Sequence, residues 1–243
     1  MKYLICNLKS NKNLKEMKEY AKTIYDINTS TTLVICPSDL YLTCIKSHIL
    51  GAQDISEYDM GPYTGEVNGE QLASLNVKYV LVGHSERRKY FQESEETLKN
   101  KIKQALKNEM KVVYCIGETK EEYSMKKTYV VLEHQIGRIL NEYTKEELKN
   151  IIIAYEPVWS ISDGKTPAPT PTKKEISDVI SFIKKLTKEY YELDFDVLYG
   201  GSANEKNVDE IKTIKSVDGL LVGGASLYPE KIISMLESIG KKD

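Results

Sequence analysis

Short runs of apolar residues recur along the chain, and longer segments rich in lysine and glutamate separate them. The runs are rich in branched side chains, which is typical of strands buried on both faces of a parallel sheet. The separating segments carry the capping and spacing signals of helices. Alternating strands and helices predict a parallel sheet with right-handed crossover connections. The expected strands are Tyr3–Cys6, Leu33–Cys36, Ile49–Gln53, Tyr79–Val82, Val112–Ile116, Ile151–Tyr155, Asp196–Tyr199 and Gly219–Val222.

Eight strand–helix units in 243 residues match the usual size of a closed (β/α)₈ barrel. We therefore expect an α/β fold with eight parallel strands surrounded by helices. Residues 1–243 are expected to form one domain, since no linker or low-complexity tract interrupts them. An open doubly wound sheet is the alternative, but no G-x-G-x-x-G pattern follows the first strand. The expected helices are Leu14–Ile27, Leu40–Ser47, Gly69–Leu75, Glu95–Asn108, Met125–Glu142, Lys173–Tyr190 with Thr172 as N-cap, Asn204–Ile214 and Pro229–Ile239.

The composition argues against several classes of protein. A net charge of −2 and a pI near 6.1 give no basic surface for nucleic acid. No apolar run approaches the roughly 18 residues of a membrane-spanning helix, and no secretory segment precedes the first strand. The four cysteines lack C-x-x-C spacing and the three histidines lack H-x-x-x-H spacing, so we expect no metal site. These features favour a cytoplasmic protein with reduced cysteines.

A barrel of this kind carries its chemistry at the C-terminal ends of its strands. The sixth expected strand ends in Glu156, which Pro157 fixes in place, and the only tryptophan, Trp159, follows. A small polar tip, Ser160–Gly164, comes next. One carboxylate at a strand end, followed by a hinged loop, predicts a proton-transfer site.

Among the other strand ends, two carry a basic side chain. Lys9 follows the first strand and is either an anion-binding lysine or a solvated surface residue. His84 follows the fourth strand, and Ser85 can cap a short helix there. The partial positive charge of a helix N-terminus disfavours the imidazolium form, so His84 is either a neutral hydrogen-bond donor or an ordinary structural histidine.

Glycine pairs follow the last two strands, as Gly200-Gly201 and Gly223-Gly224. Glycine lets backbone amides approach an anion closely, and barrels often bind phosphate at the loops after strands seven and eight. A phosphate-binding site is therefore expected here. A long loop, Gly61–Val67, follows the third strand and carries an apolar ring, Tyr63. This loop is either an ordinary surface loop or an arm that inserts into a partner subunit.

Together these strand ends resemble the triosephosphate isomerase family, a TIM-barrel family, over essentially the whole chain. The motifs that carry the resemblance are Asn7-x-Lys9, Thr64-Gly65-Glu66, His84-Ser85-Glu86-Arg87-Arg88, Cys115-Ile116-Gly117-Glu118, Ala154-Tyr155-Glu156-Pro157-Val158-Trp159, Tyr199-Gly200-Gly201-Ser202 and Leu221-Val222-Gly223-Gly224-Ala225-Ser226.

The resemblance implies interconversion of dihydroxyacetone phosphate and glyceraldehyde 3-phosphate through an enediolate, in glycolysis and gluconeogenesis, with no cofactor. It implies that Glu156 is the base at carbon, that His84 is a neutral electrophile, and that Lys9 offsets the charge of the enediolate. Asn7 is implied as a neighbouring donor, and Glu86 as the acid that steadies the lysine. The implied phosphate-binding amides belong to Ser162, Ser202, Gly223 and Gly224.

The resemblance also implies a homodimer in which the loop bearing Thr64, Gly65 and Glu66 reaches into the neighbouring subunit. A tetramer stays open. The chain departs from the family pattern at the loop tip, where Ser162 replaces a glycine and Asp163 adds a negative charge. It departs again at Asp54, where the family has asparagine. These departures bear on loop closure and on phosphate affinity.

Two other functions remain open on the sequence alone. Another sugar-phosphate barrel, such as an epimerase or a synthase, would share the phosphate glycines but not the joint set of Lys9, His84 and Glu156. A catalytically silent barrel kept as a binding protein is the second, since fold does not fix function. It predicts loss of at least one of these three side chains, and all three are present.

Overall fold

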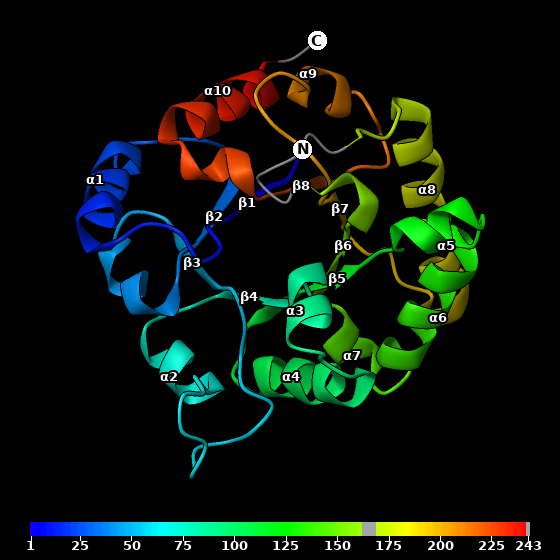
Figure 1. The fold of residues 1–243 in the computed structure, drawn as a ribbon, viewed down its shortest axis with the longest axis horizontal. Helices are drawn as coiled ribbons and strands as arrows, with labels where there is room; N and C mark the ends of the chain where they lie inside the picture. The colour runs from blue at the N-terminus through cyan, green and yellow to red at the C-terminus, as the bar shows by residue number, and fades with distance from the viewer. Residues whose placement is uncertain (162–168, 242–243) are drawn as a thin grey trace.

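The computed structural model, which describes residues 1–161 and 169–241, is a closed barrel of eight parallel strands. Each strand pairs with the next in the sequence, and β1 closes the barrel by pairing with β8. Figure 1 shows the helices as a ring around these strands. The closed barrel confirms the predicted (β/α)₈ architecture and rules out the open sheet. The strands are β1 (Tyr3–Asn7), β2 (Thr32–Cys36), β3 (Ile49–Ala52), β4 (Tyr79–Val82), β5 (Lys111–Ile116), β6 (Ile151–Tyr155), β7 (Val197–Tyr199) and β8 (Gly219–Val222).

Helices follow the strands, and they differ from the predictions mainly at their ends. They are α1 (Leu14–Ile24), α2 (Gly69–Ser74), α3 (Ser85–Tyr90), α4 (Glu95–Lys107), α5 (Lys120–Ser124), α6 (Thr128–Leu140), α7 (Lys145–Leu148), α8 (Lys173–Tyr191), α9 (Val208–Ile211) and α10 (Pro229–Gly240), with 3₁₀ turns η1 (Asp39–Cys44), η2 (Val158–Ser160) and η3 (Gly224–Leu227). The predicted N-cap of α8 is confirmed, because Thr172 and Glu175 form a capping box.

Three predicted helices differ from the structure in extent or type. Residues 40–47 were predicted as a helix, but only the short 3₁₀ turn η1 forms before β3 begins. Residues 125–142 were predicted as a helix, and α6 fills this range except at its ends; Lys126, with a φ of 57°, lies between α5 and α6 and sets the later start. Residues 204–214 contain only the short α9, because Asn204 and Asn207 hydrogen bond within a turn before it.

The strands are buried on both faces, as their apolar runs predicted. One cluster contains only strand residues, including Ile5, Leu81 and Leu198, and it fills the barrel interior. Alternate strand residues such as Leu4 and Val80 belong to a larger cluster with helix residues, between the barrel and the helices. The side-chain alternation of a strand therefore supplies both layers of the core.

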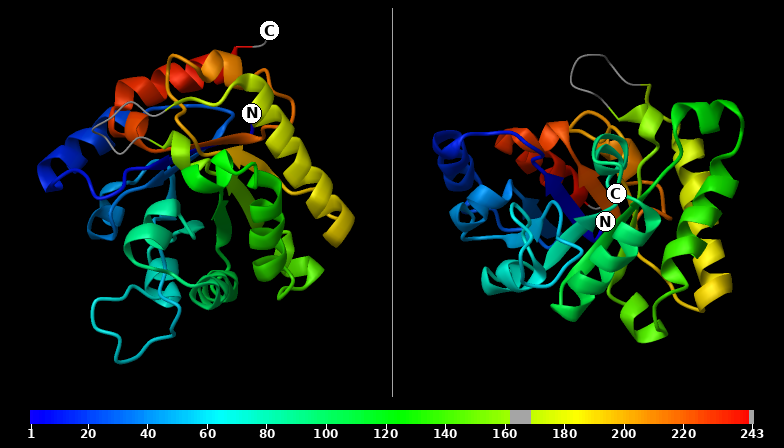
Figure 2. Two further views of the ribbon diagram at one scale, coloured as in Figure 1. Left: turned by 45° about the vertical axis from the view of Figure 1, so that its right-hand side comes forward. Right: turned by 60° about the horizontal axis from the view of Figure 1, so that its bottom comes forward.

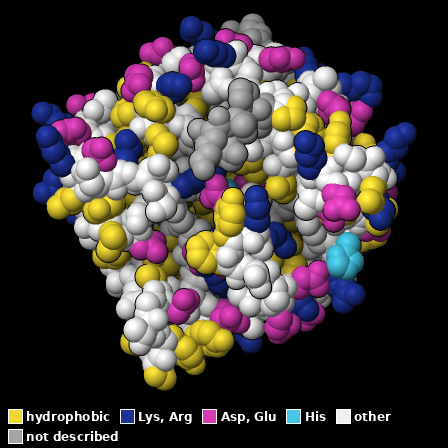
Figure 3. Space-filling view, viewed as in Figure 1, with side chains coloured by type: hydrophobic (Ala, Val, Ile, Leu, Met, Phe, Trp, Pro, Cys, Tyr) yellow, Lys and Arg dark blue, Asp and Glu magenta, His cyan; other side chains and the backbone are white. Residues whose placement is uncertain are grey.

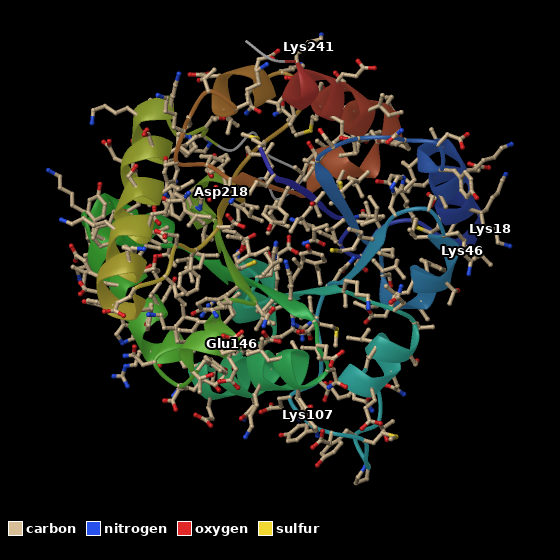
Figure 4. The ribbon with its side chains drawn as sticks, turned by 180° about the vertical axis from the view of Figure 1, so that it is seen from behind. Lys18, Lys46, Lys107, Glu146, Asp218 and Lys241 are labelled. Atoms are coloured by element: carbon tan, nitrogen blue, oxygen red, sulfur yellow. The ribbon has the colours of Figure 1, made fainter. Side chains whose placement is uncertain are left out.

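The outside of the barrel carries a projecting loop. The loop between β3 and α2 projects away from the ring of helices (Figure 2). Seen from behind, Asp218 lies inside the ring, whereas Lys18, Lys46 and Lys241 lie at its outer edge (Figure 4). In the described parts of the chain, the helices are all too short or too polar to cross a bilayer.

Candidate active site

A single cavity of about 660 Å³ collects the predicted site residues from strand ends far apart in the sequence. Figure 3 looks onto this face of the molecule, where acidic and basic side chains meet near its centre. The barrel produces this convergence because the C-terminal ends of all its strands lie on one rim. The predicted site residues that line the cavity are Asn7, Lys9, His84, Glu86, Glu156, Ser202, Gly223 and Gly224. The remaining one, Ser162, lies outside the described residues, as does Asp163.

The carboxylate of Glu156 is the most buried charge that faces the cavity, at 2% exposure. Its Oε1 lies 3.0 Å from Nε2 of His84, and its Oε2 accepts a hydrogen bond of 3.1 Å from the amide of Ser85. Burial raises the pKa of this carboxyl, but His84 and the Ser85 amide together outweigh burial and lower it. Glu156 is therefore held as an anion, ready to accept a proton.

His84 is itself the N-cap of α3, and Ser85 is the first residue of the helix, which corrects the predicted capping role of Ser85. Its Nδ1 accepts a hydrogen bond of 3.2 Å from the amide of Glu86. An amide can only donate, so Nδ1 carries the lone pair and Nε2 carries the proton. Burial lowers the pKa of the ring, but the nearby Glu156 carboxylate raises it by more.

Lys9 has a left-handed backbone, with a φ of 50°, which turns its side chain back over the rim. Two hydrogen bonds hold this turn: the Lys9 amide donates to Oδ1 of Asn7 at 3.0 Å, and Gln53 donates to the Lys9 carbonyl at 2.9 Å. The ammonium lies 2.6 Å from Oε1 of Glu86. Asn7 and Glu86 therefore fix the two ends of the lysine.

The predicted phosphate-binding region is built from two different kinds of glycine. Gly223 and Gly224 lie at the start of η3, where amide groups lack helical partners. A Cβ on Gly223 would lie 3.1 Å from Cε of Lys9, so this position keeps the lysine's path open. Gly200 instead donates its amide to the carbonyl of Tyr155 at 2.8 Å. The amide of Gly200 is therefore committed within the protein, although all four glycines line the cavity.

Ser202 is held in place by its neighbours. Its hydroxyl donates to the carbonyl of Ser160 at 2.5 Å, and its own carbonyl accepts from the side chain of Asn207 at 2.7 Å. The hydroxyl and the carbonyl are thus committed within the protein, so the amide is the group of Ser202 that can bind an anion in the cavity.

Glu118 is a structural anchor that the sequence reading left without a role. It is fully buried, and its Oε1 accepts hydrogen bonds from Tyr155 at 3.1 Å and from the Trp159 indole at 2.8 Å. Burial raises the pKa of Glu118, and these two donors partly offset the effect. The available signals were its place two residues beyond a buried strand and in a motif shared with the family. Glu118 therefore holds the segments on both sides of Glu156.

Asp54, the second departure from the family pattern, belongs to a charged cluster behind α3. Its carboxylate lies 2.8 Å from Arg87 and 2.7 Å from Lys101, and Glu93 pairs with the same two cations. The additional negative charge is therefore neutralised within this cluster.

Within residues 1–161 and 169–241, no group of three or more His, Cys, Asp or Glu side chains could hold a metal ion.

Comparison with known proteins agrees with this geometry. The family model described as Triosephosphate isomerase matches residues 2–239. The chain belongs to the triosephosphate isomerase family. The curated protein "Triosephosphate isomerase" of Mesomycoplasma hyopneumoniae (strain 7448) is 38% identical, with 97% of this chain and 98% of that protein covered. Its namesakes in Mesomycoplasma hyorhinis and Alkaliphilus oremlandii (strain OhILAs) are 35% and 36% identical, over 96% and 95% of this chain and 96% of each of those proteins.

Membership of the triosephosphate isomerase family makes the chain an isomerase and confirms the resemblance drawn from its motifs. The match runs through every strand end that contributes to the cavity, since it begins before β1 and ends within α10.

Proposed function

We propose that the chain interconverts dihydroxyacetone phosphate and glyceraldehyde 3-phosphate at this cavity, by proton transfer through an enediolate. The observation that carries the proposal is the convergence of one carboxylate, one imidazole and one ammonium on a single cavity beside the backbone amides of η3. Moving a proton between adjacent carbons needs a base near both carbons and a donor for the oxygen that becomes negative.

In this proposal Glu156 removes the proton from one carbon and returns it to the next. To reach the substrate, its carboxylate exchanges the hydrogen bonds from Ser85 and His84 for the substrate's C–H group. Glu156 is almost fully buried, so its carboxylate has little solvent shell to lose on the way.

His84 donates its Nε2 proton to the substrate carbonyl oxygen and exchanges protons between the two oxygens of the enediolate. The Glu156 carboxylate is what raises the pKa of the ring. When that carboxylate turns to the substrate, the Glu86 amide at Nδ1 remains and favours the neutral ring. His84 then acts as a neutral hydrogen-bond donor, as the sequence analysis expected.

Lys9 places a positive charge at the rim, where it offsets the charge of the phosphate and of the enediolate. Asn7 fixes the turn that presents this lysine, and Glu86 sets the position of its ammonium. The amides of Gly223 and Gly224 grip the phosphate, together with the Ser202 backbone and with the amide of Ser162, which lies outside the described residues. The substrate carbonyl is its own electron sink, so the reaction needs no cofactor and no metal.

We also propose a homodimer built on one sector of the barrel. Exposed apolar side chains follow three neighbouring strands: Leu40 after β2, Tyr63 after β3 and Phe91 after β4. Tyr63 stacks on Tyr58 with ring centroids 4.2 Å apart, at the projecting loop. An apolar sector of this kind fits a second copy of the chain, which places the loop with Thr64, Gly65 and Glu66 at the interface. We further propose one domain and a cytoplasmic location.

The test is a coupled assay of the purified chain with glyceraldehyde 3-phosphate, for the wild type and two variants. His84→Ala removes one oxyanion donor and is expected to reduce kcat on the order of 10²-fold. Glu156→Asp withdraws the base by one methylene and is expected to cost a similar factor, since about 1 Å of misplacement can cost 10²-fold. Activity unchanged in either variant contradicts the assigned role. An inactive wild type favours the silent-barrel alternative.

A further inference from the structure

Gln135, on α6, reaches out of its helix and pairs with both polar groups of one backbone residue. The amide of Gly117 donates to Oε1 of Gln135 at 2.9 Å, and Nε2 of Gln135 donates to the carbonyl of Gly117 at 3.1 Å. Gly117 lies just beyond the end of β5, where the pairing of β5 with β6 has stopped, so no neighbouring strand pairs with its backbone. One carboxamide therefore substitutes for the missing strand partner.

Gly117, the residue that Gln135 holds, packs directly against the main chain of Glu156. A Cβ on Gly117 would lie only 1.8 Å from the carbonyl oxygen of Glu156, so the two backbones are in direct contact. Hydrogen bonds flank this contact on both sides: the Glu156 amide donates to Ile116 at 2.7 Å and the Val158 amide donates to Glu118 at 3.1 Å. The position of Gly117 therefore determines the position of the Glu156 main chain, from which the carboxylate side chain extends.

The helix that carries Gln135 is itself fixed to the barrel. The hydroxyl of Tyr114, on β5, donates to the carbonyl of Gln135 at 2.9 Å. The neighbours of Gln135 on α6, Leu132 and Ile136, are fully buried. Because the helix cannot shift without breaking this packing, the carboxamide holds Gly117 at a set position relative to the strand.

We propose that Gln135 is a positioning residue for the base of the isomerase reaction, acting through Gly117 on Glu156; this rests on the function proposed above. It touches no substrate, since the cavity is lined by other side chains. Its effect is on the distance between the carboxylate and the carbon that loses a proton. That distance is the quantity to which a proton-transfer rate is most sensitive.

The test compares Gln135→Met with Val130→Met, a control on the exposed face of the same helix. Methionine keeps the length and approximate volume of glutamine but cannot pair with the backbone of Gly117. We expect Gln135→Met to lower kcat by at least roughly tenfold, because less than 1 Å of displacement already matters, with KM nearly unchanged. Val130→Met is expected to match the wild type.

Two further measurements separate positioning from a general loss of structure. The primary deuterium isotope effect on kcat, with substrate labelled at the carbon that loses its proton, is expected to rise, because proton transfer becomes slower relative to product release. The affinity for inorganic phosphate is expected to stay unchanged, because η3 is far from Gly117 in the barrel order. A smaller folded fraction would change neither quantity.

Unchanged kcat and isotope effect in Gln135→Met would overturn the proposal, and so would a parallel loss of phosphate affinity. If Gln135→Met does not fold, Gln135→Glu carries the same test, since it keeps the acceptor for the Gly117 amide and loses only the donor. Its expected kcat then lies below the wild type, and equality with the wild type would overturn the proposal. Wild-type activity in the same assay tests the proposed function separately.

Discussion

Replacing Asp39 with asparagine is expected to stabilise the folded chain at neutral pH but much less in mild acid. Asp39 begins η1, and its Oδ1 is buried with no hydrogen-bond partner among the described residues. The nearby cluster of Asp54, Glu93, Arg87 and Lys101 already balances two acids against two bases. Asp39 is thus a third acid without a cation of its own.

Burial, and then the Asp54 charge, raise the pKa of Asp39 from 3.8 to about 6. The folded-state value lies above the unfolded one, so the folded chain favours the protonated acid. The benefit of that proton is complete below the unfolded pKa and is lost as pH rises through the folded pKa. By linkage, the raised pKa of Asp39 lowers the free energy of unfolding by roughly 1.5 kcal/mol at pH 5 and about 3 kcal/mol at pH 7.5, relative to a side chain that does not titrate.

The assay is urea unfolding of the wild type and Asp39→Asn at pH 5 and at pH 7.5, at one protein concentration. Asparagine keeps the shape and removes the charge. Any cost of burying its amide is the same at both pH values and cancels in the difference. The advantage of the variant is expected to grow by about 1.5 kcal/mol from pH 5 to pH 7.5.

Asp26→Asn is the matched control, because it removes the same charge from an exposed position. It is expected to change stability by no more than about 0.5 kcal/mol at either pH. The reasoning is refuted if the Asp39 variant shows the same advantage at both pH values, or if it becomes less stable as pH rises.

Three other substitutions test the supports of the site. Glu86→Gln removes the charge that holds the Lys9 ammonium, and kcat/KM is expected to fall roughly tenfold, equivalent to about 1.4 kcal/mol; an unchanged value would remove Glu86 from the site. Gly117→Ala places a Cβ 1.8 Å from the carbonyl of the base, and activity is expected to be lost; a fully active variant would show that this contact can relax. Trp159→Phe leaves buried Glu118 short of one donor and is expected to cost about 1–3 kcal/mol in urea unfolding; no loss would mean that the tyrosine donor suffices.

The barrel and most of the site could be predicted because they depend on local patterns. A strand buried on both faces has to be apolar, so β4, β6 and β8 appear in the sequence with the same bounds as in the structure. The chemistry of a barrel lies where these runs end, so Lys9 and Glu156 could be found by looking just beyond each strand. The strand order then placed them together without any further information.

The helix ends were harder to predict, because side chains compete with the backbone for hydrogen bonds. Asn204 and Asn207 close a turn that replaces the first half of a predicted helix. Lys126 adopts a left-handed conformation that no residue type demands, and it delays the start of another predicted helix to Thr128. Each outcome depends on a few tertiary contacts, which periodicity does not record.

The supports of the site could not be predicted, because they connect residues whose separation in sequence carries no pattern. Gln135 lies 18 positions from Gly117, in the middle of a helix in which a glutamine is unremarkable. Asp39 stands at the start of a turn, where an acid usually needs no explanation. Its raised pKa comes from burial and from Asp54, a residue of another loop. Only the folded chain shows which polar groups meet.

The glycines around Glu156 have a role that the phosphate argument did not foresee. Gly117 follows β5 and Gly200 follows β7, and these two strands flank β6, whose end carries the base. A Cβ on Gly200 would lie 2.9 Å from Cγ of Glu156, and one on Gly117 would lie 1.8 Å from its carbonyl oxygen. The base therefore lies in a slot walled by backbone on both sides. The backbone of a barrel moves less than side chains do. Because the two glycines bring this backbone against Glu156, they restrict the movement of its carboxylate.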